Sequence, residues 1–168
     1  IICYTRADPK NIRKGVSVYM EIERKFLIEQ PPENYTSFPY HMIEQAYLCT
    51  DPVIRIRRED NDYYLTYKSK GVLSKEEYNL PLTKSAYEHL LQKADGNILR
   101  KKRYLLPLEN HPELTIELDL FEGKFSGLIL AEVECPTEEE AMSLEPPGWF
   151  TRDVTFTGEY QNSRLSRL

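Results

Sequence analysis

The chain has 168 residues, 40% of them hydrophobic and twelve of them tyrosine, so it can bury the core of one domain and lacks the composition of a disordered segment. Its formal net charge of −5 argues against general binding to nucleic acid or to an anionic membrane, because both favour an excess of Lys and Arg. No stretch approaches the roughly 20 apolar residues of a membrane-spanning helix.

Three widely spaced cysteines, Cys3, Cys49 and Cys135, form no CxxC pair, so the sequence indicates neither a zinc site nor a disulfide framework. We therefore expect a cytoplasmic protein in which Cys49 and Cys135 are buried, inert thiols. Residues 1–19 carry four basic residues without an apolar run or a periodic pattern. We expect them to be an N-terminal extension of a single domain over residues 20–168.

Along the chain, apolar residues alternate with charged or polar ones in seven or eight short segments, which is the pattern of β-strands. Strands are expected at residues 20–28, 43–48, 53–59, 63–70, 76–82, 98–106, 114–121 and 128–135. Helical patterns cover residues 83–94 and 137–144. In the first of them, Ser85 and Glu88 have capping-box spacing, and Gly96 is expected to follow its end. The predicted fold class is mostly antiparallel α+β.

Charged residues recur at positions i and i+2 on six of these strands, and the two members of each pair have the same sign. The acidic pairs are Glu21/Glu23, Glu117/Asp119 and Glu132/Glu134. The basic pairs are Arg55/Arg57, Lys68/Lys70 and Lys101/Arg103. Lys25 and Glu77 share the charged face by the same register argument.

These pairs have two interpretations. Each pair alone is typical of an ordinary half-exposed sheet, whose outer face is polar. The segregation of signs by strand, together with the use of Arg, favours charged faces that converge inside a closed barrel. Burying so many charges requires ion pairing, bound metal or a highly charged ligand. Carboxylates suit Mg²⁺ or Mn²⁺, and Arg and Lys suit phosphate, so the pattern indicates a metal-dependent polyphosphate site.

Glu21-Ile22-Glu23-Arg24-Lys25 resembles the ExExK signature of the CYTH superfamily, the triphosphate tunnel metalloenzymes. Further segments follow in the family's order: Arg55-Ile56-Arg57, Lys68, Lys101-Lys102-Arg103, Glu117-Leu118-Asp119 and Glu132-Val133-Glu134. The resemblance covers roughly residues 20–165. Leu73 to Tyr78 and Pro147 to Phe150 resemble the short bacterial members in particular.

The resemblance implies a closed eight-stranded antiparallel β-barrel with a charged interior and helices packed outside. Its tunnel would bind a triphosphate and Mg²⁺ or Mn²⁺. The implied metal ligands are Glu21, Glu23, Asp119, Glu132 and Glu134. The implied phosphate-binding residues are Lys25, Arg55, Arg57, Lys68, Lys75, Lys101 and Arg103. The implied catalytic residues are Lys25, Glu77 and Glu132, with Glu117 in support.

Two positions depart from the family pattern. Asn79 stands where members often have a second glutamate, which leaves open whether one metal ion or two are bound. Ser163 follows Tyr160-Gln161-Asn162 where many members have a basic residue, and Arg164 comes one position later.

The function implied by the resemblance is metal-dependent hydrolysis of inorganic triphosphate or a related polyphosphate. The alternatives are a class IV-type adenylyl cyclase, a thiamine-triphosphatase, or a non-catalytic polyphosphate-binding module, which the missing glutamate at Asn79 favours. We expect a small molecule containing a triphosphate as the partner, with no nucleic acid and no membrane. Related proteins are commonly dimers, so a homodimer is a further expectation.

Overall fold

The computed structural model describes residues 17–168, with side chains from Met20 onward. The strands are β1 (Ser17–Leu27), β2 (Tyr40–Thr50), β3 (Val53–Glu59), β4 (Asp62–Lys68), β5 (Ser74–Pro81), β6 (Asp95–Leu108), β7 (His111–Phe121), β8 (Ile129–Glu134) and β9 (Arg152–Asp153). The helices are α1 (Lys84–Leu91), α2 (Glu138–Ser143) and α3 (Asn162–Leu165), with 3-10 turns η2 (Tyr35–Ser37) and η3 (Gly123–Phe125).

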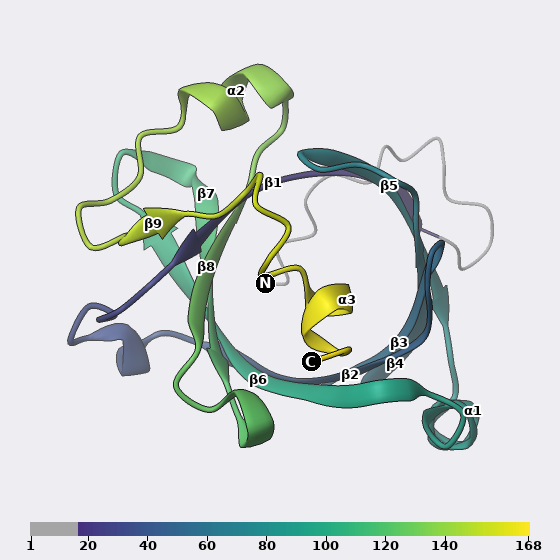
Figure 1. The fold of residues 1–168 in the computed structure, drawn as a ribbon. Helices are drawn as coiled ribbons and strands as arrows, with labels where there is room; N and C mark the ends of the chain where they lie inside the picture. Colours follow the sequence, from purple (N-terminus) through teal and green to yellow (C-terminus); the bar gives the residue numbers. More distant parts are fainter. Residues whose placement is uncertain (1–16) are drawn as a thin grey trace.

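Eight of the strands close into an antiparallel barrel (Figure 1). They follow the order β5-β4-β3-β2-β6-β7-β8-β1, and a further pairing of β1 with β5 joins the two ends of this order. β1 divides its length between its neighbours, since residues 17–22 pair with β5 and residues 23–27 pair with β8. The short β9 adds to the outside of β1. The predicted eight-stranded barrel is therefore confirmed.

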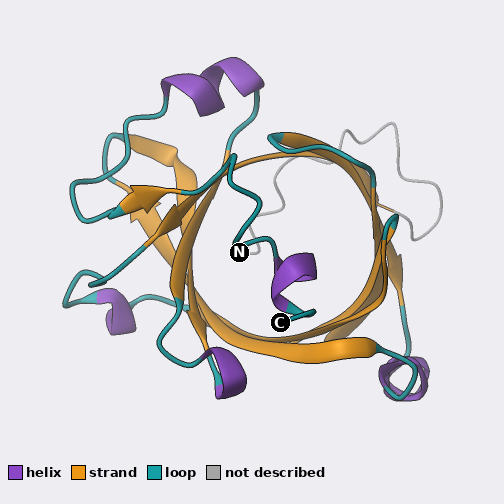
Figure 2. Cartoon of the chain, viewed as in Figure 1, coloured by secondary structure: helices purple, strands orange, loops and turns teal. Residues whose placement is uncertain are grey.

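The outward-facing side chains of the barrel are apolar where helices and loops cover them. Ala46 of β2 and Ile56 of β3 pack with Tyr87 of α1 in one buried cluster. On another side of the barrel, Phe26 of β1 and Ala141 of α2 belong to a larger cluster. α1 and α2 lie outside the ring of strands (Figures 1 and 2). Because side chains alternate along a strand, the charged positions between these apolar ones face the barrel axis.

Along several strands, the side chains that face the barrel axis change from charged to apolar toward one end of the barrel. The inward-facing neighbour two positions from Lys101 is Leu99; that of Asp119 is Phe121, and that of Glu132 is Leu130. These three side chains and Tyr47 form a buried cluster with Leu165 of α3, which we call the apolar floor. α3 lies inside the ring of strands (Figure 1). The charged part of the tunnel is thus closed on this side by a small hydrophobic core.

Several element boundaries differ from the sequence prediction. α1 is capped by the Thr83 side chain, which accepts a hydrogen bond from the backbone N–H of Ala86, so the Ser85/Glu88 capping box was wrong. β6 already begins at Asp95, and Gly96 lies within it. There the backbone of Asn97 donates a 2.6 Å hydrogen bond to the Ser166 carbonyl. Through this contact with the residue that follows α3, about 70 positions away, the segment expected to end the helix becomes the start of a strand.

The predicted domain boundary at Met20 lies inside β1, which begins at Ser17. The expected extension before that residue, including Cys3, lies outside the described residues. Cys135 is buried, and this burial raises the pKa of its thiol to about 11, as expected of an inert thiol. Cys49 is only partly buried. None of the helices over residues 17–168 is long and apolar enough to cross a lipid bilayer.

Candidate active site

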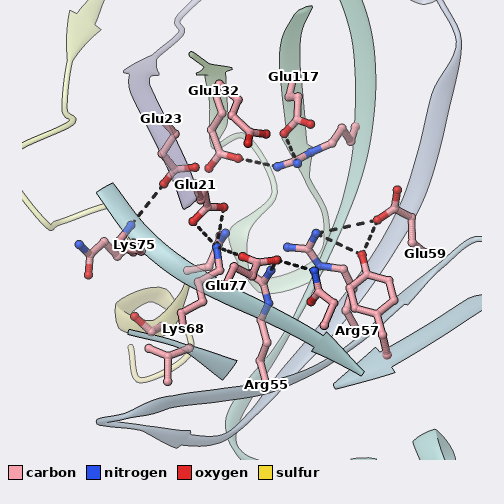
Figure 3. Close-up of a pocket in the computed structure, with 18 of the residues that line it drawn as sticks. Glu21, Glu23, Arg55, Arg57, Glu59, Lys68, Lys75, Glu77, Glu117 and Glu132 are labelled. Carbon is pink, nitrogen blue, oxygen red and sulfur yellow. Dashed lines mark hydrogen bonds and ion pairs between the residues drawn. The ribbon is translucent and has the colours of Figure 1, made fainter. Parts of the chain in front are cut away.

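A cavity of about 1310 Å³ occupies the charged part of the tunnel (Figure 3). Twelve of the fourteen residues predicted for the site line it. They are Glu21, Glu23, Lys25, Arg55, Arg57, Lys68, Lys75, Glu77, Arg103, Glu117, Glu132 and Glu134. The sequence prediction that the charged faces converge inside a barrel is therefore correct.

Strand register brings these side chains together, because several stand directly opposite one another on neighbouring strands. Glu23 and Lys25 of β1 face Glu134 and Glu132 of β8. On the other side of β1, Glu21 faces Lys75 of β5. Opposite residues of an antiparallel pair have Cβ atoms roughly 5 Å apart, within reach of long side chains. The ExExK segment therefore contacts both of its neighbouring strands through charged side chains.

Lys68 of β4 lies between two carboxylates. Its Nζ is 2.6 Å from an oxygen of Glu21 and 2.6 Å from Oε2 of Glu77. Burial alone would lower the pKa of Lys68, but the negative charges of Glu21, Glu77 and Glu23 together outweigh it and raise the pKa. For Glu21, burial raises the pKa against the attraction of Lys68. The ion pair keeps Lys68 protonated in a buried position.

Arg55 of β3 is the residue in this region with an unsatisfied donor. Its Nη2 lies 3.6 Å from Oε1 of Glu77, a long ion pair. Its Nε is buried and has no hydrogen-bond partner. An unpaired buried donor on a cation is costly, and an anion in the cavity would satisfy it.

Glu132 of β8 is held by two cations. Its Oε1 is 2.9 Å from Nζ of Lys25, and its Oε2 accepts a 2.6 Å hydrogen bond from Nη2 of Arg103. Burial alone would raise the pKa of Glu132, but Lys25 and Arg103 hold it well below its usual range. Lys25 also lies 3.3 Å from Glu23, where Lys75 approaches to 3.6 Å. The charges of these lysine and arginine side chains lower the pKa of both Glu23 and Glu132, so these two carboxylates remain ionised.

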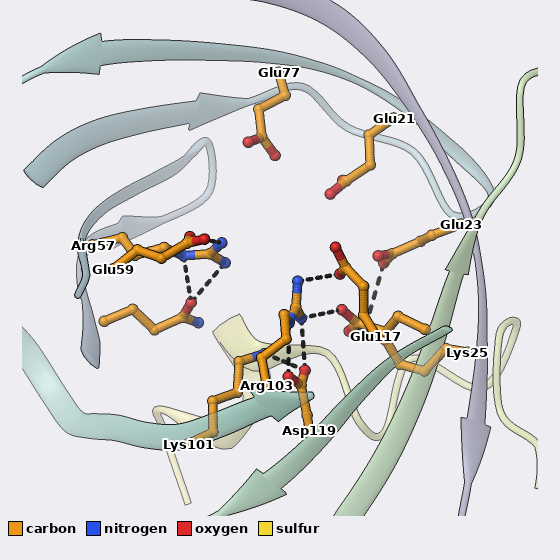
Figure 4. A network of polar contacts seen from close by, with 12 residues as sticks. Glu21, Glu23, Lys25, Arg57, Glu59, Glu77, Lys101, Arg103, Glu117 and Asp119 are labelled. Carbon is orange, nitrogen blue, oxygen red and sulfur yellow. Dashed lines mark hydrogen bonds and ion pairs between the residues drawn. The ribbon is translucent and has the colours of Figure 1, made fainter. Parts of the chain in front are cut away.

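Lys101 and Asp119 differ from the prediction, because they do not line the cavity. Both are 0% exposed and form an ion pair beneath it, shared with Arg103 (Figure 4). Sequence alternation shows which face a side chain takes but not its depth in the tunnel. Lys101 and Asp119 lie next to the apolar floor, where Nζ of Lys101 is 5.4 Å from the centre of the Phe121 ring. Burial, and then the charge of Arg103, lowers the pKa of Lys101 to about 8.

Sequence reasoning missed a polar group on β2, β3 and β4 around Arg57. Oε1 of Gln45, a fully buried residue, accepts hydrogen bonds from Nε and Nη2 of Arg57 at 3.2 and 2.9 Å. The Tyr64 hydroxyl donates a 2.7 Å hydrogen bond to Glu59, and both residues lie near Nη1 of Arg57. Gln45 and Tyr47 share a strand face at i and i+2, which is the signal that could have revealed Gln45.

The two departures from the family pattern have clear structural settings. Asn79 accepts a 2.6 Å hydrogen bond from the Thr66 hydroxyl and donates one of 2.9 Å to Oε1 of Glu77. It therefore orients that carboxylate. At the other departure, Ser163 lines the cavity, whereas Arg164 is exposed and lies outside its lining.

The carboxylates of β1 and β8 have the donor chemistry of a site for Mg²⁺ or Mn²⁺, which prefer oxygen ligands. Glu21, Glu23 and Glu134 supply such oxygens from adjacent register positions. Over residues 17–168, however, no three His, Cys, Asp or Glu side chains are grouped so that they could hold a metal ion. Lys68 contacts Glu21, and Lys25 contacts Glu23. The donor set fits a hard divalent cation, provided that these lysines give up their contacts.

Asp119 fits a metal ion less well than the other predicted ligands. Its Oδ1 accepts from Nε of Arg103, and its Oδ2 accepts from Nη2 of Arg103 and from Nζ of Lys101. Both oxygens are thus committed to cations that are themselves buried.

Comparison with known proteins agrees with this geometry. The CYTH domain profile matches residues 20–146. An inorganic triphosphatase of Nitrosomonas europaea is 36% identical over 151 residues, which are 87% of this chain and 96% of that protein. An inorganic triphosphatase of Acetivibrio thermocellus is 33% identical over 86% of this chain and 92% of its own length. A crystal structure of an inorganic triphosphatase matches with a TM-score of 0.66 and 34% identity, over 87% of this chain and 93% of the other. The chain therefore belongs to the CYTH family.

Proposed function

We propose that this protein is a divalent-metal-dependent hydrolase of inorganic triphosphate. The observation that carries the proposal is the convergence of six largely buried basic side chains on one cavity that carboxylates also line. These six are Lys25, Arg55, Arg57, Lys68, Lys75 and Arg103. A linear triphosphate presents many anionic oxygens, and a buried set of cations is complementary to that charge. The inorganic triphosphatases that are similar over nearly their whole length support the same substrate.

Triphosphate binding would exchange one set of ion pairs for another. Without ligand, Lys25 and Lys68 lie against Glu132, Glu23, Glu21 and Glu77. Phosphate oxygens would draw the basic side chains toward the substrate and so release carboxylate oxygens. Nε of Arg55, which has no partner, would gain one directly. The site would then keep its charges paired in both states, which limits the cost of burying them.

The released carboxylates would serve a metal ion. Glu21, Glu23 and Glu134 are the ligands that we assign to Mg²⁺ or Mn²⁺. When bound, such an ion would supply positive charge that offsets the negative charge developing on the phosphate oxygens during phosphoryl transfer. Asp119, which Arg103 and Lys101 hold on both oxygens, is reassigned from metal ligand to anchor of Arg103.

Hydrolysis requires a water molecule directed at a terminal phosphorus. Attack forms a bond from the water oxygen to that phosphorus, breaks its bond to the bridging oxygen, and yields orthophosphate and pyrophosphate. Glu132 and Glu77, lying on β8 and β5, are the carboxylates that we propose to orient the water and accept its proton. Lys25 and Arg103 contact Glu132 and would stabilise the oxygens of the transferred group.

The test is product analysis with Mg²⁺ or Mn²⁺ and one of three substrates: inorganic triphosphate, ATP or thiamine triphosphate. We expect orthophosphate and pyrophosphate from inorganic triphosphate. Cyclic AMP from ATP would instead indicate an adenylyl cyclase, and preferential turnover of thiamine triphosphate would indicate a thiamine-triphosphatase. Tight binding of triphosphate without turnover would indicate a binding module.

A matched pair of variants ties the activity to the tunnel. Lys25→Ala should reduce turnover of triphosphate at least about a hundredfold, because it removes a cation that contacts Glu132 and faces the cavity. Lys93→Ala removes the same charge from an exposed position after α1 and should leave turnover unchanged. Size-exclusion chromatography with light scattering would test the predicted homodimer, and fractionation of cells would test the predicted cytoplasmic location.

A further inference from the structure

Arg57 is oriented by a neutral side chain that stands directly opposite it. Gln45 of β2 and Arg57 of β3 are register partners. Oε1 of Gln45 accepts from Nε at 3.2 Å and from Nη2 at 2.9 Å, so the amide binds one edge of the guanidinium. This two-point contact fixes the plane of the guanidinium as well as its position.

Gln45 is itself held in place. It is 0% exposed, and its Nε2 donates a 3.1 Å hydrogen bond to the Tyr47 hydroxyl. Because a guanidinium can only donate, the amide oxygen Oε1 faces Arg57, and Nε2 therefore faces the Tyr47 hydroxyl. Since Tyr47 belongs to the apolar floor, the orientation of Arg57 is linked to a rigid part of the barrel.

The chemistry of this contact differs from that of three other cations that line the tunnel. Lys25, Lys68 and Arg103 each have a carboxylate oxygen within 2.9 Å. Arg57 has its two shortest side-chain contacts with an amide oxygen, and its ion pair with Glu59 is 3.9 Å long (Figure 4). An amide can orient a guanidinium but contributes no negative charge to it.

We propose that Gln45 is a positioning residue: it sets the guanidinium of Arg57 toward the cavity without neutralising it, so that Arg57 can bind a phosphate group of the substrate. The proposal rests on the function proposed above. Gln45 does not itself line the cavity, so it acts through Arg57. A carboxylate at this position would hold Arg57 in the same geometry but would compete with phosphate for its charge.

The test is calorimetric binding of inorganic triphosphate, with EDTA present to exclude divalent metal, followed by steady-state kinetics with Mg²⁺. Gln45→Glu keeps the shape of the side chain and adds a charge next to Arg57. We expect it to weaken triphosphate binding about tenfold or more, and to raise KM more than it lowers kcat. Gln92→Glu adds the same charge at the exposed end of α1 and should bind triphosphate like the parent protein.

Gln45→Met separates orientation from charge, because it removes the hydrogen bonds and adds no charge. We expect its affinity to lie between those of the parent protein and Gln45→Glu. It also keeps the test decisive if Gln45→Glu does not fold. A purely structural role for Gln45 would lower the melting temperature of both variants while leaving triphosphate affinity unchanged, and would overturn the proposal.

The outcomes distinguish this inference from the proposed function. If the parent protein neither binds triphosphate nor hydrolyses it with Mg²⁺, the proposed function itself fails. If the parent protein binds triphosphate and Gln45→Glu or Gln45→Met binds it equally well, only the assignment of Gln45 fails.

Discussion

Arg103 and Asp119 stand opposite each other on β6 and β7 and are joined by two parallel hydrogen bonds, from Nε to Oδ1 at 2.7 Å and from Nη2 to Oδ2 at 2.6 Å. Lys101, two residues before Arg103, contacts the same carboxylate from below. Nη2 of Arg103 also reaches Glu132, which lines the cavity. The buried ion pair of Lys101 and Asp119, which lies outside the cavity lining, thus supports a carboxylate of the lining through Arg103.

Lys101 should make stability depend on pH in the alkaline range. Burial lowers its pKa to about 8 in the folded protein, whereas an unfolded lysine titrates near its ordinary value of 10.5. Between these values the unfolded chain binds more protons, so the free energy of unfolding gained from Lys101 rises with pH, with a slope of at most about 1.4 kcal/mol per pH unit. Urea unfolding of the parent protein and Lys101→Met from pH 7 to 10 would measure the difference.

The control for that series is Lys102→Met, which changes the neighbouring and more exposed lysine of the same strand. Its free energy of unfolding should change with pH in the same way as that of the parent protein. If the free energy of unfolding of Lys101→Met also followed that of the parent protein from pH 7 to 10, the lowered pKa of Lys101 would be contradicted.

Glu23→Gln should weaken metal binding. It keeps the side-chain volume but removes a negative charge from the proposed ligands, and the affinity of hard cations depends on ligand charge. We expect Mn²⁺ to bind about tenfold more weakly or worse, as measured by electron paramagnetic resonance titration without substrate. Glu139→Gln, at an exposed position of α2, is the matched control. Equal Mn²⁺ affinity in Glu23→Gln and the control would exclude Glu23 as a ligand.

Asp119→Asn should act on stability instead. It leaves Lys101 and Arg103 buried with one negative partner fewer, and breaking a buried ion pair costs roughly 3–5 kcal/mol. Chemical denaturation would show the loss of unfolding free energy, while Mn²⁺ affinity at low temperature should be almost unchanged. A stable Asp119→Asn protein that has lost Mn²⁺ binding would restore Asp119 as a metal ligand.

Gly96→Ala should displace α3 from the end of the barrel. Gly96 has a φ of +73°, and an added Cβ would lie 2.2 Å from the Ser166 carbonyl oxygen. Gly123 has a similar φ of +64° but open space around it, so Gly123→Ala carries the backbone strain alone. We expect Gly96→Ala to lose about 1–3 kcal/mol more stability than Gly123→Ala. Amide exchange over residues 162–168 should be faster only in Gly96→Ala, and equal exchange in both would show that α3 is held independently.

The barrel and most of the site could be predicted because charge alternates with apolar residues along each strand. Glu21, Glu23 and Lys25 show this most clearly, since their neighbours Ile22 and Phe26 are buried under the outer covering. The alternation specifies which face of the strand a side chain takes. Because acidic pairs and basic pairs lie on different strands, the charged faces were expected to meet inside a closed barrel. The alternation cannot specify depth, which is why Lys101 and Asp119 were expected in the cavity lining.

Gln45 and the start of β6 show a second limit. Gln45 carries no charge and is not part of a charged pair. Its spacing from Tyr47 indicates which strand face it takes, but its contact with Arg57 depends on the register of β2 against β3, which the sequence does not display. Gly96 and Asn97 look like a helix stop locally, but they contact the backbone of Ser166, about 70 residues away. Contacts of this range override local preference, and no local pattern reports them.

The division of β1 between two neighbours has a consequence for how the protein acquires its structure. β1 comes first along the described chain, yet its residues 23–27 pair with β8, whose residues lie more than 100 positions later. Pairings of such sequence separation are slow to form, because a long loop must close first. The strand that carries Glu21, Glu23 and Lys25 therefore completes its pairing only when nearly the whole barrel has formed. The catalytic interior and the finished fold should appear together, so that partly folded chains have no activity.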